Sequence, residues 1–195
     1  MNPRTRFVTV VVAAAVVALM FVSCKVTPEG ISATLAFDEM GGATYFEGET
    51  VDLDGVIVTV LPTQDLSGEA HRGGNAIVLD SNLAGGSGYE LELNDACIGL
   101  NFGGRVIGIE LRVGDNGDWV NLGVNGTLRT QPDLPGVSVA GVMITAVPNG
   151  SDAFNLTIAG EIIPTMYTIG GASGEFNLVI GGSYVHIDDV VSVAE

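Results

Sequence analysis

Two pairs of acidic residues lie near the two ends of the chain and could bind a cation. Asp38 and Glu39 follow the first apolar stretch, and Asp188 and Asp189 lie inside the last one. If that last stretch is a strand, alternation places Asp189 among apolar residues, where an ionised carboxylate is costly unless it is paired. Ca²⁺ takes about six to eight oxygen ligands, so we expect a structural calcium ion at these four residues. A bulge that turns both aspartates to solvent, or backbone amides that satisfy Asp189, would explain the same pattern.

A tryptophan flanked by polar residues could bind a sugar. Trp119 is the only tryptophan of the chain, and Asp118, Asn121 and Arg112 accompany it. An indole supplies a flat apolar surface, while acid, amide and guanidinium groups supply directional hydrogen bonds. We therefore expect these four residues to form a ligand-binding surface. A tryptophan that covers an open sheet edge would fit the same sequence.

The residue types that many catalytic sites need are scarce and isolated. His71 and His186 are the only histidines, and neither belongs to a zinc-binding spacing or a nucleophile motif. His186 alternates with the apolar Val185, so we expect it to face solvent. Cys97 has no basic neighbour in the sequence, so we expect a small buried side chain rather than a nucleophile. The sequence predicts no enzymatic activity.

The elements that would position these residues are short strands. Apolar and polar residues alternate after residue 30, and Gly-Gly, Asn-Gly and Asp-Gly pairs separate the apolar stretches. This pattern is typical of a β-sandwich or barrel. We expect an all-β, jelly-roll-like antiparallel β-sandwich of roughly ten strands.

One Asn-Gly pair predicts a particular hairpin. A tight turn at Asn116 and Gly117 would pair residues 109–113 with residues 120–124, with apolar residues of both strands on one face. The same turn would set Asp115 opposite Asp118. Their repulsion would be relieved by a cation or screened by water.

Two further Asn-Gly pairs give different expectations. The pair at residues 149–150 predicts a hairpin in which Met143 lies opposite Leu156. The pair at residues 125–126 would set the apolar Leu122 opposite the charged Arg129, so we expect a bulged or wider loop there.

The two acidic ends resemble a known kind of domain. Phe37-Asp38 near the start and the run Ile187-Asp188-Asp189-Val190 near the end are similar to the opening and closing strands of jelly-roll modules in secreted bacterial proteins, including carbohydrate-binding-like modules. The resemblance implies that the opening strand pairs with the closing one. It also implies glycan binding, with acids at those ends holding a structural calcium ion.

The first 23 residues resemble the signal peptide of a bacterial lipoprotein. Arg4 and Arg6 precede an apolar run over residues 7–22, which is shorter than a membrane-spanning helix, and residues 21–24 resemble a lipobox that ends in Cys24. The resemblance implies a lipid on Cys24 and a mature protein in the bacterial cell envelope, at the outer membrane if the cell is Gram-negative. An uncleaved signal anchor, or ordinary secretion with Cys24 incidental, would also fit.

Charge and length limit the remaining functions. After residue 23 the chain has 172 residues and a formal charge of −18, which disfavours nucleic acid and anionic headgroups as partners. We expect a signal peptide (1–23), a short tether (24–30) and one β-sandwich domain (31–195). The expected function is a non-catalytic, surface-anchored binding module for glycan or another extracellular polymer. The alternatives are a structural envelope lipoprotein without a specific ligand and, third, a hydrolase.

Overall fold

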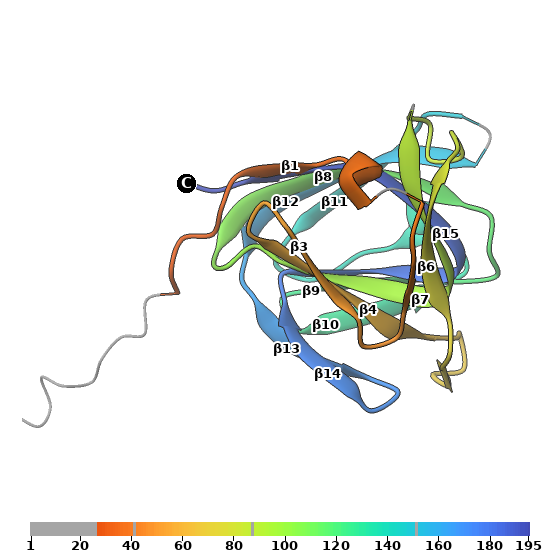
Figure 1. Ribbon diagram of the computed structural model, residues 1–195. Coiled ribbons are helices and arrows are strands. Elements are labelled where there is room, and N and C mark those ends of the chain that lie inside the picture. Colours follow the sequence, from red (N-terminus) through yellow and green to blue (C-terminus); the bar gives the residue numbers. More distant parts are fainter. Residues whose placement is uncertain (1–26, 41, 87, 151) are drawn as a thin grey trace, which may run out of the picture.

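The structure is a computed structural model that describes residues 27–40, 42–86, 88–150 and 152–195. The signal peptide and Cys24 lie outside the described residues. Within the described part, the all-β prediction is confirmed, with fifteen strands rather than about ten (Figure 1). No helix of the described part is long and apolar enough to cross a membrane. The strands are β1 (Ala33–Leu35), β2 (Thr44–Phe46), β3 (Thr50–Leu53), β4 (Val56–Gln64), β5 (Ala70–His71), β6 (Asn75–Asp80), β7 (Tyr89–Asn101), β8 (Val106–Asp115), β9 (Val120–Val124), β10 (Thr127–Gln131), β11 (Met143–Pro148), β12 (Ala153–Ile162), β13 (Thr165–Ile169), β14 (Ala172–Phe176) and β15 (Leu178–Val193); the 3-10 turns are η1 (Phe37–Met40) and η2 (Leu134–Gly136).

The sandwich is built around two long strands, β7 and β15, which pair with each other in both layers. One layer has the order β10-β9-β15-β7-β4-β3 and uses the first half of β15. The other has the order β11-β12-β8-β15-β7-β6-β2 and uses the second half of β15. β1 continues beside the end of β15, with Leu35 opposite Val190, so the first strand pairs with the last. Phe37 and Asp38 themselves lie in η1 rather than in a strand.

The long strands bend at one line, where the layers meet. In β7, Asp95 adopts a positive φ of 47°, and the buried positions shift by one residue, from Leu91 and Leu93 to Ala96 and Ile98. In β15 the same shift separates Ile180 from Val185. Successive side chains of a strand point to opposite faces of the sheet. The one-residue shift therefore lets each strand direct apolar side chains into the core in both layers.

The predicted hairpin at Asn116 and Gly117 is wrong. β8 pairs with β12 and β15, while β9 pairs with β10 and β15, so the two segments do not pair with each other. Both run antiparallel to β15, one after the other, and residues 116–119 connect the layers at the bend. The expected apolar positions are nevertheless buried, because the alternation within each strand is the same in either pairing. Asp115 therefore does not lie opposite Asp118.

The other two Asn-Gly pairs also differ from expectation. Residues 125–126 do form a tight two-residue turn between β9 and β10, with positive φ at Asn125 and Gly126, and Leu122 lies opposite Arg129. The hairpin at residues 149–150 is confirmed, but four residues connect its strands, and Leu156 lies opposite Ala146 rather than Met143.

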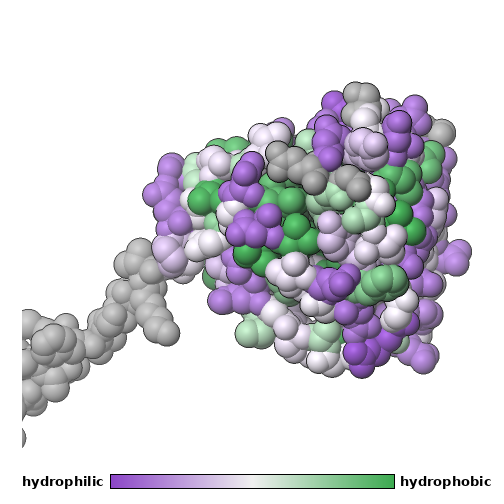
Figure 2. Space-filling model, viewed as in Figure 1, coloured by the Kyte–Doolittle hydropathy of each residue, from purple (hydrophilic) through white to green (hydrophobic). Residues whose placement is uncertain are grey.

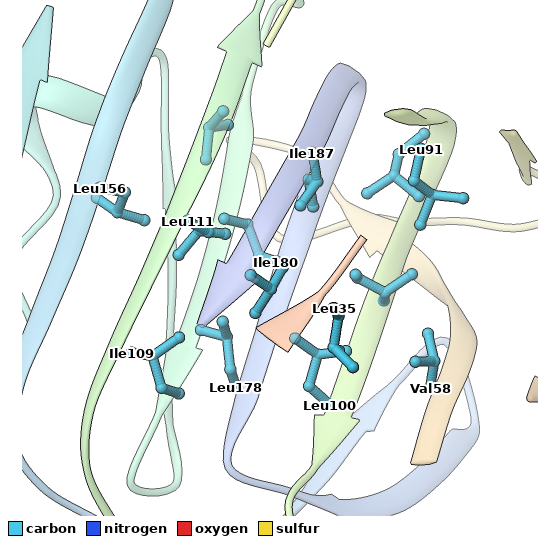
Figure 3. Packing of buried hydrophobic residues seen from close by; sticks show 14 of the residues in the cluster. Leu35, Val58, Leu91, Leu100, Ile109, Leu111, Leu156, Leu178, Ile180 and Ile187 are labelled. Atoms are coloured by element: carbon cyan, nitrogen blue, oxygen red, sulfur yellow. The ribbon is translucent and has the colours of Figure 1, made fainter. Parts of the chain in front are cut away.

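A large apolar core fills the space between the layers. Figure 3 shows side chains from both layers converging there, among them Val58, Leu100, Ile109 and Ile180. A second, smaller cluster lies outside the first layer, where the β13–β14 hairpin covers outward-facing residues; its members are Leu61, Cys97, Tyr167, Ile169, Phe176 and Val179. On the face seen in Figure 2, hydrophilic residues are widely spread and hydrophobic ones gather near the centre.

Candidate functional site

The bend leaves a hollow of about 380 Å³ between the connecting segment and β15. Trp119 and Asp118 enter it from the connecting segment, Ser183 and Tyr184 from β15, and Asp95 from the kink of β7. We call this hollow the corner pocket; its lining residues are His71, Asp95, Asn116, Gly117, Asp118, Trp119, Ser183 and Tyr184. The same break that replaces the expected hairpin therefore forms the pocket.

The indole of Trp119 is half-buried and held from two sides. Its Nε1 donates a hydrogen bond to Thr63 Oγ1 at 3.2 Å. The ring centroid lies 4.9 Å from that of His71, with the rings tilted by 48°. The Nε2 of His71 in turn lies 3.2 Å from Asp65 Oδ2. Contacts of this kind fix the orientation of an aromatic surface before a ligand arrives.

Asn121, which the sequence analysis assigned to the ligand-binding surface, is fully buried beneath the pocket. Its Oδ1 accepts hydrogen bonds from Thr63 Oγ1 at 2.8 Å and from the Gln64 backbone N–H at 2.7 Å. Its Nδ2 donates to the Gln64 carbonyl and to Thr130 Oγ1. Asn121 thus supports the residue that holds Trp119 and does not line the pocket.

Ser183 joins the connecting segment to β15. Its Oγ accepts hydrogen bonds from the backbone N–H groups of Asp118, at 2.6 Å, and of Trp119, at 3.4 Å. A Cβ on Gly117 would lie 2.2 Å from this oxygen, so only glycine fits at that position. The hydroxyl proton of Ser183 has no acceptor among the described residues and can be donated to a ligand.

Arg112 lies outside the corner pocket. It lines another hollow, of about 360 Å³, on the outer face of β8, β12 and β15. Its Nε lies 3.1 Å from Asp189 Oδ2, and its NH1 donates to the Gly85 carbonyl. The sequence analysis grouped Trp119 with Asp118, Asn121 and Arg112. The structure brings Trp119 and Asp118 together in the pocket, whereas Asn121 lies below the pocket and Arg112 lies outside it.

Three acids of the predicted calcium site, Asp38, Asp188 and Asp189, have contacts other than those expected. Asp38 Oδ1 accepts a hydrogen bond from the Tyr89 backbone N–H, Asp189 pairs with Arg112, and Glu39 lies beside Asp38 in η1. A bulge in β15, with a positive φ at Asp189, breaks the alternation on which the expectation rested. Asp188 is buried, and burial, together with the charges of Asp189 and Glu90, raises the pKa of its carboxyl. Within the described part of the chain, no group of three or more His, Cys, Asp or Glu side chains is arranged to hold a metal ion. Calcium therefore stays a prediction from the sequence.

The expectation that His186 faces solvent is wrong. It points to the outer face of its layer, as alternation requires, but it is fully buried there, and Leu83 and Ala84 lie against its neighbours Gly114 and Glu90. His186 Nδ1 lies 2.7 Å from Glu90 Oε1, and Nε2 lies 3.6 Å from Glu92 Oε2, although neither ring nitrogen has hydrogen-bond geometry. Glu90 also accepts the backbone N–H groups of Leu83 and Ala84, which ties the segment between β6 and β7 to the sheet.

The prediction that Cys97 is buried is confirmed. Burial raises the pKa of its thiol to about 12, so the thiolate that a nucleophile needs is absent at neutral pH.

Sequence reasoning left six lining residues of the corner pocket out of the ligand-binding surface: His71, Asp95, Asn116, Gly117, Ser183 and Tyr184. They come from separate parts of the chain and meet only where the strands bend. In β7 the apolar positions alternate up to Leu93 and resume one residue out of phase at Ala96, and this shift around Asp95 was a local sign of a kink. Comparison with known protein families, curated proteins and solved structures finds no match to this chain.

Proposed function

We propose that this protein is a non-catalytic binding protein for an extracellular glycan and that a lipid on Cys24 anchors it in the bacterial cell envelope. The observation that carries the proposal is the half-buried indole of Trp119, fixed by Thr63 and His71 at the wall of an open pocket. A preorganised ring of this kind suits the apolar face of a sugar. Ser183, Asn116 and Asp118 surround it with hydrogen-bonding groups for hydroxyls.

An alternative function is that of a hydrolase, because Ser183, His71 and Asp65 have the residue types of a catalytic triad. In such a triad the serine donates its proton to the histidine. Here the described hydrogen bonds of Ser183 Oγ come from the Asp118 and Trp119 backbone, and none joins it to His71. This arrangement favours binding over nucleophilic catalysis.

Affinity electrophoresis with a panel of soluble polysaccharides tests the proposal, because a bound polymer retards the migration of the protein. We expect at least one polysaccharide to retard the wild type and Trp119→Ala to lose most of that retardation. Tyr89→Ala is the matched control, since Tyr89 is 40 % exposed and lies outside the pocket. If Trp119→Ala binds as the wild type does, the pocket is not the binding site. If no polysaccharide binds, a structural envelope lipoprotein is the better description.

The anchor is tested separately. Intact mass and detergent partitioning after expression in a bacterial host should show a lipid on a chain that begins at Cys24, and Cys24→Ser should move the protein to the aqueous phase without changing its melting temperature. An unmodified Cys24, or a soluble form that keeps residues 1–23, would refute the anchor but not the binding site.

A further inference from the structure

The corner pocket carries negative charge that the described part of the protein does not neutralise. Asp95 and Asp118 line it, and neither carboxylate makes an ion pair or a side-chain hydrogen bond with another described residue. Asp118 is exposed and Asp95 lies at the kink of β7, so both can reach a ligand. The pocket therefore presents two free carboxylates beside an aromatic surface.

The one basic side chain of the pocket lining is already engaged, as are two arginines outside the lining. His71, the only basic residue of the lining, faces Asp65. Hydrogen bonds from Ser67, His71 and the Glu69 backbone lower the pKa of Asp65 to about 2, although desolvation opposes them, so this carboxyl stays ionised at neutral pH. Arg72 pairs with Glu47, and Arg112 pairs with Asp189. A ligand that carries carboxylate, sulfate or phosphate groups would meet repulsion in the pocket, whereas a cation would meet attraction.

The aromatic rings of the pocket also favour a cationic ligand. Trp119 and Tyr184 both line the pocket. A cation close to an aromatic face is attracted by the negative potential of the ring. The pocket thus combines two carboxylates, two aromatic side chains and the free hydroxyl proton of Ser183.

We propose that the corner pocket binds an amino sugar, that is, a glycan with free, protonated primary amines. This inference rests on the proposed glycan-binding function and names the class of glycan. The amine lies between Asp95 and Asp118, the sugar ring lies against Trp119, and a hydroxyl accepts the Ser183 proton. An N-acetylated sugar keeps the ring contact but has no charge for the carboxylates.

The test uses the full chain purified in detergent and the fluorescence of Trp119, which is the only tryptophan and so reports on this pocket alone. Four probes are titrated below the pKa of the sugar amine: glucosamine oligomers, the matching N-acetylglucosamine oligomers, glucose oligomers and the polyamine spermidine. We expect the glucosamine oligomers to bind roughly tenfold more tightly than the other two sugars, and this preference to shrink as salt is added.

Charge-removing variants test the assignment of the carboxylates. Asp118→Asn should weaken glucosamine binding several-fold and leave N-acetylglucosamine binding unchanged, and Asp95→Asn should do the same. Asp80→Asn is the matched control, because Asp80 is an exposed acid at the end of β6, outside the pocket lining. Melting temperatures verify that all three variants are folded.

The outcomes separate this inference from the proposed function. Equal affinity for the charged and the N-acetylated oligomers would overturn the amino-sugar inference and leave glycan binding standing. Spermidine binding as tight as that of the glucosamine oligomers would overturn it as well, since the sugar would then contribute nothing. If no oligomer changes the fluorescence, and no polysaccharide retards the protein, both proposals fail.

Discussion

Asn121→Ala is expected to destabilise the protein and to release Trp119 from its fixed position. The Asn121 side chain binds both the N–H and the carbonyl of Gln64, at 2.7 Å each, as a neighbouring strand would. Its Oδ1 also accepts a hydrogen bond from the hydroxyl of Thr63. The oxygen of that hydroxyl in turn accepts a hydrogen bond from the indole N–H of Trp119. Alanine removes every hydrogen bond of the Asn121 side chain, so Thr63 loses the acceptor that orients its hydroxyl and the backbone groups of Gln64 lose their partners.

The expected loss follows from the groups left without a partner. A buried donor or acceptor that loses its hydrogen bond costs about 1–3 kcal/mol. Gln64 is half-exposed, so water can partly replace the amide, and we take the lower end for its two backbone groups. The free energy of unfolding should then fall by about 2–3 kcal/mol. For a chain of this size that corresponds to a decrease of the melting temperature by roughly 4–12 °C.

Thermal unfolding, monitored by circular dichroism, measures the loss of stability. The tryptophan emission of the folded variant measures the release of Trp119. The emission maximum should move to longer wavelength as the indole becomes more exposed to water. Asn155→Ala is the matched control, because Asn155 is an exposed amide on β12, and it should change stability by less than about 0.5 kcal/mol. If Asn121→Ala unfolds at the same temperature as this control and keeps the wild-type emission, the network beneath the pocket does not hold Trp119.

Three further predictions concern other parts of the structure. Cys97, with its raised pKa and full burial, should not react with a thiol reagent at about pH 8 until denaturant is added; rapid labelling of Cys97 in native Cys24→Ser protein would contradict the packing under β13 and β14. Burial, and to a smaller extent Asp133 and Asp152, raises the pKa of Asp115, so the folded state holds this proton more tightly than the unfolded state. Stability therefore falls as the pH rises from the unfolded pKa to the folded pKa and stays lower above it. Asp115→Asn should therefore gain stability relative to the wild type as the pH rises from about 4 to neutral, and a constant difference measured by urea unfolding across that range would refute the assignment. The calcium site expected from the sequence requires the melting temperature to rise with Ca²⁺ and fall with chelator, and Asp189→Ala to abolish the difference; an unchanged melting temperature in the wild type refutes it.

The corner pocket was only partly predictable. Local residue types were enough to single out Trp119 with Asp118, because a lone tryptophan among polar groups is informative wherever the chain folds. Its neighbours Ser183 and Asp95 come from strands far away in the sequence. No short-range pattern indicates that β7 and β15 bend at the same line and that the chain passes from β8 to β9 there. The expected hairpin would have set Arg112 opposite Asn121 and so beside Trp119. That hairpin does not form, and Arg112 lies opposite Asp188 instead.

The Asn-Gly pairs show why a local turn signal does not determine which strands pair. The pairs at residues 116–117 and 125–126 have the same two residues, yet one connects the two layers and the other closes a tight turn. A turn residue permits a reversal of the chain, but the hydrogen-bonding partner of the next strand decides whether a hairpin forms. For β8 and β9 that partner is β15, which lies more than fifty residues later in the sequence.

The sequence alone determined the all-β class and, in regular strands such as β8 and β9, which residues face the core, since both follow from a two-residue alternation that does not depend on the partner strand. At the bulge of β15 this alternation fails. It also determined that Cys97 is buried. Only the tertiary structure decided the pairing of β8 and β9 with β15, the place of the corner pocket and the burial of His186. Alternation specifies the face on which a side chain lies, but whether that face meets water depends on the segments that pack on it, as Leu83 and Ala84 pack against the neighbours of His186. Such coverage is a non-local property of the chain.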